Sequence, residues 1–223
     1  MTSACLFSGG KDSTLALHRA ASLGIRIDLL ITMRSSNPDS YMFHYPNIGF
    51  TAMQADALGI RQVFASTEGK KEEELKDLEE ALRASGAELL VTGATYSEYQ
   101  GSRINSIAKK LGIEHLAPLW HINPLEELGE IAERFDAIIT SVSAEGFDES
   151  FLGKKIDREM IGRLTDLNKR HGINMLFEGG EAESFVLDAP MFRKGIAIKS
   201  ARKEYRGTSG RYIIKEAEFV DKD

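Results

Sequence analysis

Apolar residues in the first 118 positions follow two alternating patterns, short continuous runs and longer stretches with a helical repeat. Short runs of this kind are typical of buried strands, because a strand covered on both faces carries apolar residues on both. In one longer stretch Ile104, Ile107, Ala108 and Leu111 form a single apolar helix face. We therefore expect strands at 4–7, 28–33, 62–66, 88–92 and 114–117, and helices at 14–23, 48–58, 72–85 and 103–111.

A glycine follows each of these expected helices, at positions 24, 59, 86 and 112. Glycine adopts the left-handed conformation that ends many helices at little cost. Strand, helix and glycine in this repeating order indicate a parallel sheet with flanking helices, that is, an α/β fold.

The pattern changes after Pro118. Helices are expected at 124–134 and 157–170 and a strand at 137–142, with a Gly/Glu-rich segment at 178–183. Two more strands are expected between 196 and 220, around the turn-forming tetrapeptide 207–210. We predict two domains, an α/β domain at 1–118 and a smaller C-terminal α+β domain at 119–223.

Composition mainly excludes classes of protein. No run approaches the roughly 18 apolar residues of a membrane span, and the first 20 residues do not resemble a secretory signal. The single cysteine, Cys5, excludes an intramolecular disulfide and suggests a reducing, cytoplasmic location; its apolar surroundings predict a packed residue and not a nucleophile. A net charge of −6 argues against a large nucleic-acid footprint.

The hexapeptide Ser8-Gly9-Gly10-Lys11-Asp12-Ser13 lies between the first expected strand and helix. Adjacent glycines let a ligand approach the backbone closely, and a helix N-terminus directs its N–H groups at an anion. The serine hydroxyls donate hydrogen bonds, Lys11 adds positive charge, and Asp12 offers an oxygen ligand for Mg²⁺. These properties suit the phosphates of ATP with their metal ion.

The spacing differs from the better-known phosphate loops. A Walker A motif requires a glycine where Cys5 stands and a Ser or Thr where Asp12 stands, and Gly9-Gly10 does not give the Rossmann G-x-G-x-x-G spacing. On spacing alone, an ordinary glycine-rich turn between strand and helix stays open.

This hexapeptide after a first strand resembles the pyrophosphate loop of the N-type ATP pyrophosphatases. The resemblance implies an adenine-nucleotide α-hydrolase-like (HUP) parallel sheet. It also implies a reaction in which a substrate oxygen is adenylated, pyrophosphate is released, and a nitrogen or sulfur nucleophile displaces AMP.

Further segments, in family order, resemble the diphthine–ammonia ligase branch. They are DSYMFHYPN at 39–47, VTGA at 91–94, Tyr99-Gln100 with Arg103, LAPLW at 116–120, AEG at 144–146, DES at 148–150, LGK at 152–154, EGGE at 178–181 and LDAP at 187–190. One departure is Ala182, where the family pattern has a bulkier residue. The branch implies an ATP-dependent ligase that amidates diphthine on elongation factor 2 with ammonia, giving diphthamide, AMP and pyrophosphate.

The same resemblance suggests roles for individual residues. Lys11, Asp12 and Glu183 are expected to be catalytic, with Asp12 also the metal ligand. Substrate binding is assigned to Glu178, Gly179, Gly180, Glu181 and Glu183, whose carboxylates would attract the trimethylammonium group of diphthine or the ammonium. ATP or pyrophosphate binding is assigned to Ser8, Gly9, Gly10, Lys11, Asp12, Ser13, Thr32, His44, Thr92, Gly93 and Arg103.

Each assignment has a structural alternative. Glu-Gly-Gly-Glu is also typical of a solvated turn, His44 lies in an aromatic stretch that suits a packed loop, Thr92-Gly93 suits a plain β–α turn, and Arg103 suits a helix surface. At the level of function, the alternatives are a tRNA-modifying adenylating enzyme with the same loop and an ATP-binding sensor without turnover.

The expected cofactors are ATP and Mg²⁺. The expected partners are elongation factor 2 and ammonia, with a homodimer as a candidate assembly; neither a membrane nor a nucleic acid is expected as a partner.

Overall fold

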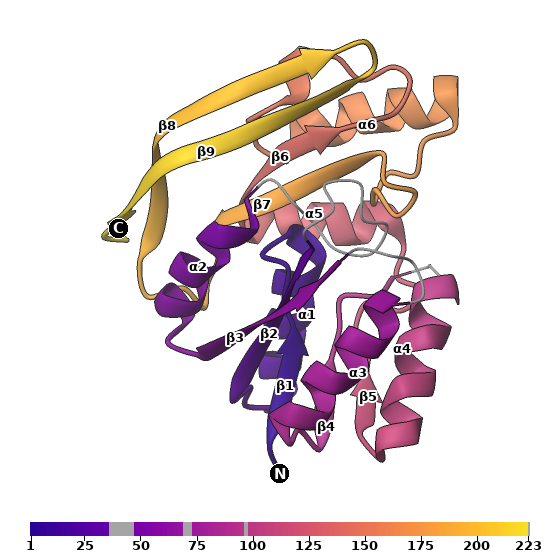
Figure 1. The fold of residues 1–223 in the computed structure, drawn as a ribbon. Coiled ribbons are helices and arrows are strands. Elements are labelled where there is room, and N and C mark those ends of the chain that lie inside the picture. Colours follow the sequence, from indigo (N-terminus) through magenta and orange to yellow (C-terminus); the bar gives the residue numbers. More distant parts are fainter. Residues whose placement is uncertain (36–46, 69–72, 96–97, 223) are drawn as a thin grey trace. The chain divides into compact units, whose positions relative to one another are not determined.

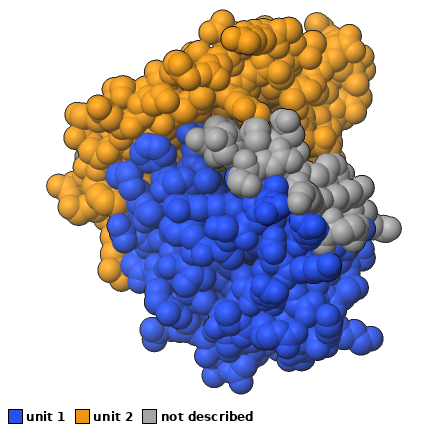
Figure 2. All heavy atoms as spheres, in the orientation of Figure 1, with its two compact units in different colours: residues 1–121 blue, residues 122–223 orange. Residues whose placement is uncertain are grey.

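The computed structural model describes residues 1–35, 47–68, 73–95 and 98–222 (Figure 1). The chain forms two compact units, residues 1–121 and 122–223 (Figure 2), whereas the sequence pattern placed the change after Pro118. Within the described ranges, every helix is too short or too polar to cross a membrane.

The first unit is built on a five-stranded parallel sheet in the order β3-β2-β1-β4-β5, which confirms the predicted α/β fold. Its central strand pairs on both sides, since Cys5 stands opposite Leu30 in β2 and Val91 in β4. The strands are β1 Ser3–Leu6, β2 Leu29–Ser35, β3 Arg61–Thr67, β4 Leu89–Val91 and β5 Glu114–Leu116.

The helices of this unit are α1 Lys11–Ser22, α2 Thr51–Leu58 after the short 3-10 helix η1 Ile48–Phe50, α3 Glu73–Ser85 and α4 Glu98–Leu111. Leu78, Leu82 and Ile104 of α3 and α4 are buried in one core cluster with sheet residues such as Ile31 and Leu90. Burial of this apolar face contributes roughly 25 cal/mol per Å² of area removed from water. The predicted helix starts at Thr14 and Arg103 were late, because the first turns of α1 and α4 lack an apolar repeat.

The second unit contains a four-stranded antiparallel sheet in the order β7-β6-β9-β8. Its elements are α5 Pro124–Arg134, β6 Asp136–Val142, η2 Glu149–Phe151, α6 Arg158–His171, β7 Ala182–Asp188, β8 Gly195–Arg206 and β9 Ser209–Val220. Strand β7 was not among the predicted strands; it begins within the Gly/Glu-rich segment 178–183, and its residues Phe185, Val186 and Leu187 are buried.

The β8–β9 hairpin extends from the Gly195–Val220 pair to the Arg206–Ser209 pair. Strand β9 pairs with β6 only through Arg211 and Gly210, so most of the hairpin is a two-stranded ribbon with β8 at the sheet edge. The long ribbon is visible in Figure 1 as the two yellow strands.

Candidate active site

The hexapeptide loop follows β1 at the point where the strand order of the first unit reverses. Strand β1 is flanked by β2 and β4, and the chain crosses from one side of β1 to the other between β3 and β4. In open α/β sheets, ligands bind outside the carboxyl ends of the strands at such a switch point. The topology therefore places residues 8–13 where a nucleotide site is expected.

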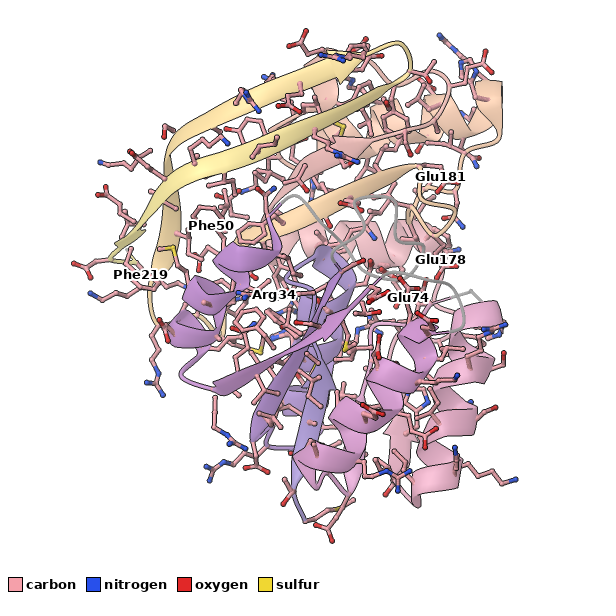
Figure 3. The ribbon with its side chains drawn as sticks, viewed as in Figure 1. Arg34, Phe50, Glu74, Glu178, Glu181 and Phe219 are labelled. Atoms are coloured by element: carbon pink, nitrogen blue, oxygen red, sulfur yellow. The ribbon has the colours of Figure 1, made fainter. Side chains whose placement is uncertain are left out.

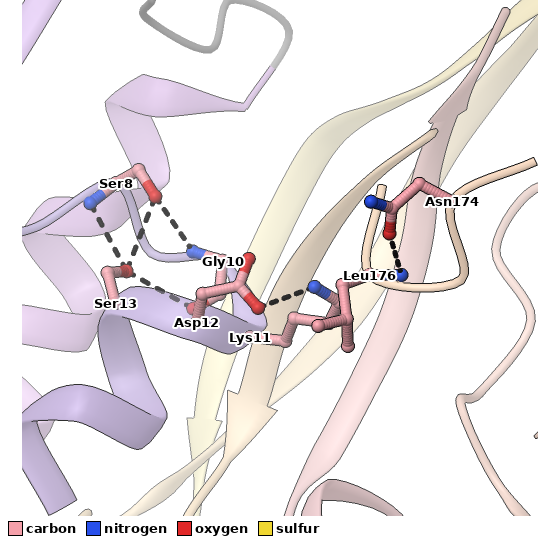
Figure 4. A network of polar contacts seen from close by, with 7 residues as sticks. All are labelled: Ser8, Gly10, Lys11, Asp12, Ser13, Asn174 and Leu176. Carbon is pink, nitrogen blue, oxygen red and sulfur yellow. Dashed lines mark hydrogen bonds and ion pairs between the residues drawn. The ribbon is translucent and has the colours of Figure 1, made fainter. Parts of the chain in front are cut away.

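Two serine hydroxyls hold the loop closed (Figure 4). The main-chain N–H of Ser8 donates to Ser13 Oγ over 3.3 Å, the two hydroxyl oxygens lie 3.3 Å apart, and Ser13 Oγ donates to the Gly10 carbonyl over 3.2 Å. Ser13 is 6% exposed. These bonds preorganise the loop, so a polyphosphate would meet a backbone already shaped.

Gly9 and Gly10 have different structural roles in the loop. Gly9 has a φ of +77°, and a β-carbon there would lie 2.1 Å from Oε1 of Gln54, whose Nε2 donates to the Gly9 carbonyl over 2.9 Å. Gly10 is the N-cap of α1 and has no side chain to accept from the first helical N–H groups. The N-terminus of α1 thereby presents main-chain donors and the positive end of its dipole to an anion.

Lys11 and Asp12 form an ion pair at this helix end. Lys11 is 1% exposed, and its Nζ lies 2.5 Å from Oδ1 of Asp12, whose side chain is 35% exposed. The buried ammonium supplies positive charge beside the uncapped helix end, and the partly exposed carboxylate balances that charge.

This donor set fits a magnesium ion carried by a nucleotide. Mg²⁺ in phosphate sites commonly takes one or two carboxylates and fills its other positions with phosphate oxygens and water. Within the described part of the chain, no three His, Cys, Asp or Glu side chains are grouped to hold a metal by themselves. Asp12 would supply one carboxylate of such a set.

Gly93 follows β4 and touches the first turn of α1. A β-carbon at Gly93 would lie 2.6 Å from the main-chain carbon of Asp12 and 2.7 Å from the nitrogen of Ser13. The structure thus brings Gly93 together with the loop, as a glycine required for close packing against the helix start.

Thr92 forms a polar chain that sequence reasoning did not find. Its buried hydroxyl lies 2.8 Å from His115 Nε2, and His115 Nδ1 lies 2.6 Å from Asn105 Oδ1. Burial lowers the pKa of His115, which favours a neutral ring that donates from Nδ1 and accepts the Thr92 proton at Nε2. The one signal in the sequence was the position of His115 in a strand next to β4.

Thr32 forms hydrogen bonds that hold the backbone immediately before the loop. Its hydroxyl is completely buried, donates to the Phe7 carbonyl over 2.7 Å and accepts from Gln62 Nε2 over 2.7 Å. These contacts fix the backbone just before Ser8, while direct contact of Thr32 with ATP stays a prediction.

Three further residues of the first unit were considered in the sequence: Arg103, His44 and Cys5. Arg103 is half-buried in α4, and His44 lies outside the described residues. Cys5 has no exposed surface, and burial raises the pKa of its thiol to about 12, so it is a protonated core residue, as expected.

In the second unit the predicted acidic cluster forms a tightly held turn followed by a strand (Figure 3). Oε1 of Glu181 accepts from the Asn174 main-chain N–H over 2.8 Å. Figure 4 shows the next bond of the turn, in which Asn174 Oδ1 accepts from the Leu176 N–H over 2.8 Å. Ser143 binds the other side of the turn, donating its N–H to the Glu181 carbonyl over 2.8 Å and its hydroxyl to the Gly180 carbonyl. Phe177 has a φ of +69°, an uncommon conformation for an aromatic residue; its N–H donates to the Asn174 carbonyl and its carbonyl accepts from the Gly180 N–H, both over 3.0 Å.

The three glutamates of this cluster therefore lie in different structural environments. Glu178 lies half-buried in the turn, Glu181 closes it, and Glu183 is a residue of β7 paired with Ser141. Glu181 Oε2 is buried and has no hydrogen-bond partner among the described residues. The structure gives Glu181 a role in shaping the turn, and leaves substrate contact by Glu178 and Glu183 as a prediction.

Comparison with known proteins agrees with the division into two units. Residues 1–115 match the family model of the diphthamide synthase N-terminal domain, and residues 123–220 match that of the diphthamide synthase C-terminal domain. The chain is 34% identical over 227 residues to the diphthine–ammonia ligase of Homo sapiens, covering 90% of this chain and 84% of that protein. It is 28% identical to the diphthine–ammonia ligase of Saccharomyces cerevisiae, covering 85% of this chain and 33% of that protein.

Among solved structures, the chain is similar to a protein from Methanocaldococcus jannaschii described as a predicted subunit of tRNA methyltransferase. The sequence identity is 20% and the TM-score 0.46, with 85% of this chain and 98% of that chain covered. A likeness at this level does not bear on function.

Proposed function

The chain belongs to the diphthine–ammonia ligase family, and on that premise we propose that it amidates diphthine with ammonia at the expense of ATP, releasing AMP and pyrophosphate. The observation that carries the ATP-dependent part is the start of α1. There an N-terminus without a side-chain cap, the buried Lys11 ammonium and the partly exposed Asp12 carboxylate meet at the sheet's switch point.

The chemistry requires a leaving group, because a carboxylate oxygen is a poor one. In the first step a carboxylate oxygen of diphthine attacks the α-phosphorus of ATP, and pyrophosphate leaves. In the second, ammonia attacks the acyl carbon, AMP leaves with the bonding electrons, and the amide nitrogen loses a proton. Atoms balance without any redox partner.

Residues of the loop would act chiefly in the first step. The main-chain N–H groups at the start of α1 and the Lys11 ammonium would bind the leaving pyrophosphate, which lowers the barrier by stabilising its developing charge. Mg²⁺, bound through Asp12, would neutralise further phosphate charge. Gly93 would keep the first turn of α1 at the sheet edge.

Residues of the acidic turn would act on the substrate. Diphthine carries a trimethylammonium group, which carboxylates attract through Coulomb forces. We assign that attraction to Glu178 and Glu183, while Glu181 holds the turn through Asn174.

The protein substrate is elongation factor 2 in this proposal, with free ammonia as the nitrogen source and the cytoplasm as the location. A homodimer stays a candidate assembly. The tRNA-modifying alternative is not favoured, because the family and the net charge of −6 both oppose it.

One incubation tests the proposal. Purified diphthine-bearing elongation factor 2 is mixed with the protein, ATP, Mg²⁺ and ammonium, and the modified histidine is analysed by mass spectrometry. The expected result is the mass change for replacing a hydroxyl by an amino group, together with stoichiometric pyrophosphate. ATP hydrolysis or ATP binding with an unchanged histidine would contradict the proposed substrate.

A further inference from the structure

Positive charge is concentrated in one part of an otherwise acidic chain. Residues 199–215, the outer part of the β8–β9 hairpin, carry six Lys or Arg and one Glu, a net charge of +5. All other residues together carry 22 Lys or Arg and 33 Asp or Glu, a net charge of −11. The six basic residues are Lys199, Arg202, Lys203, Arg206, Arg211 and Lys215.

One face of the hairpin attaches it to the rest of its unit. Tyr205 donates its hydroxyl hydrogen to the Phe147 carbonyl over 3.0 Å. On the same face, a β-carbon on Gly153 would lie 2.7 Å from the Tyr212 ring, and Ile214 is 3% exposed. Tyr205, Tyr212 and Ile214 of this face therefore pack inside the unit.

The opposite face carries the arginines. Side chains alternate between the two faces of a strand, so Arg202, Glu204 and Arg206 of β8 share the face away from Tyr205. Their cross-strand partners on that face are Ile213, Arg211 and Ser209. Arg202 and Arg206 are exposed, and Arg202 forms an ion pair with Glu204.

Protection of a sheet edge does not account for this composition. Charged side chains on an edge strand prevent pairing with other chains, and β8 is an edge strand. Lysine is the side chain most used for that purpose, however, whereas this face carries Arg202, Arg206 and Arg211. Edge protection therefore does not explain why arginine is the basic residue on this face.

We propose that the arginine-bearing face of the hairpin, with exposed Arg202 and Arg206 and half-buried Arg211 and Ile213, is a docking surface for an acidic patch on the protein substrate. The inference rests on the proposed function for the identity of that partner. Arginine forms paired hydrogen bonds with carboxylates and is enriched in protein interfaces. The apolar Ile213 and the negative Glu204 within the face suit a mixed protein surface better than the continuous phosphates of RNA, which Glu204 and the net −11 of the other residues would repel.

Paired variants test the surface. Arg202→Gln/Arg206→Gln removes two charges from the face, Arg202→Lys/Arg206→Lys keeps them, and Lys169→Gln/Arg170→Gln removes two exposed charges at the end of α6 as a matched control. Binding to immobilised diphthine-bearing elongation factor 2 is measured by surface plasmon resonance at several salt concentrations, beside a structured RNA. Circular dichroism verifies folding, and the Km for ATP is measured in parallel.

The glutamine pair should weaken binding of the factor about tenfold at low salt, with a smaller salt dependence. The lysine pair should retain most of the affinity, the α6 control should match the wild type, and the Km for ATP should stay unchanged. Equal losses in the control, no loss in the glutamine pair, no binding of the factor by the wild type, or hairpin-dependent binding of RNA in place of the factor would each overturn the docking surface. Hairpin-dependent binding without amide formation would support docking while refuting the proposed reaction.

Discussion

Gly93 lies so close to Asp12 that the carboxyl end of β4 and the first turn of α1 are in backbone contact. A β-carbon on Gly93 would come within 2.6 Å of the main-chain carbon and 2.8 Å of the carbonyl oxygen of Asp12. Backbone atoms cannot rotate away as a side chain can. The strand edge therefore determines where the helix that carries Lys11 and Asp12 begins.

Replacing Gly93 by alanine should move this helix start. We expect Gly93→Ala to lower the free energy of unfolding by roughly 1–3 kcal/mol, as overpacking does, and to raise the Km for ATP. Urea unfolding and pyrophosphate release measure the two effects. Gly49→Ala is the matched control, since a β-carbon at Gly49 meets nothing within 4 Å; a Gly93 variant as stable and active as this control would refute the close-packing role.

Removing the charge of Asp12 should reduce Mg²⁺-dependent turnover. Asp12→Asn keeps the shape of the side chain but weakens both the 2.5 Å contact with Lys11 and binding of the metal. Pyrophosphate release is measured while Mg²⁺ is titrated, with the expectation that the variant needs more Mg²⁺ and reaches a lower maximum, and that Asp12→Ala is inactive. Asp56→Asn, on α2, is the control. An unchanged dependence of pyrophosphate release on Mg²⁺ for Asp12→Asn would show that Asp12 is not a metal ligand.

His115 should make stability depend on pH. Burial lowers its pKa in the folded protein below the ordinary value of about 6.5, so the unfolded chain binds the proton more readily. The contribution of His115 to the free energy of unfolding is therefore complete at pH values above its ordinary pKa. That contribution is lost as the pH falls through the ordinary pKa toward the lower pKa of the folded protein. Urea unfolding of wild type and His115→Gln between pH 5 and 8 measures the difference, which should shrink at the acid end. A difference independent of pH would mean that His115 stays in one protonation state.

The elements whose ends carry local signals were predicted well, and those set by distant contacts were not. Helix α5 was predicted with its observed bounds, because Pro124 stands at the first helical position and the Asn123 side chain accepts from Leu125 N–H. Strand β7 was missed because its neighbours Gly179 and Gly180 suggested only a turn.

In the candidate site, too, features that are local in sequence were predicted, and features that depend on distant contacts were not. The hexapeptide is local in sequence and its position after β1 followed from the pattern, whereas the Thr92–His115–Asn105 chain joins a strand end, a second strand and a helix. The close approach of Gly93 to Asp12 likewise depends on the strand order. Neither could be predicted from residue spacing, because the polar chain requires β5 beside β4 and the Gly93 contact requires β4 beside β1.

Variants of the acidic turn distinguish residues that stabilise the turn from residues that take part in amide formation. Glu181→Ala removes the acceptor of the Asn174 N–H, and a lost hydrogen bond to a charged group costs about 1.5–3 kcal/mol, so this variant should unfold at lower urea. Glu181→Gln keeps an acceptor at that position and should recover much of the stability. Glu183→Ala, which lies within β7, should instead retain ATP binding while impairing amide formation. Urea unfolding, ATP affinity and the mass-spectrometric assay are measured on all three; wild-type amidation by Glu183→Ala would dismiss its catalytic assignment, and full stability of Glu181→Ala would show that Asn174 does not need this carboxylate.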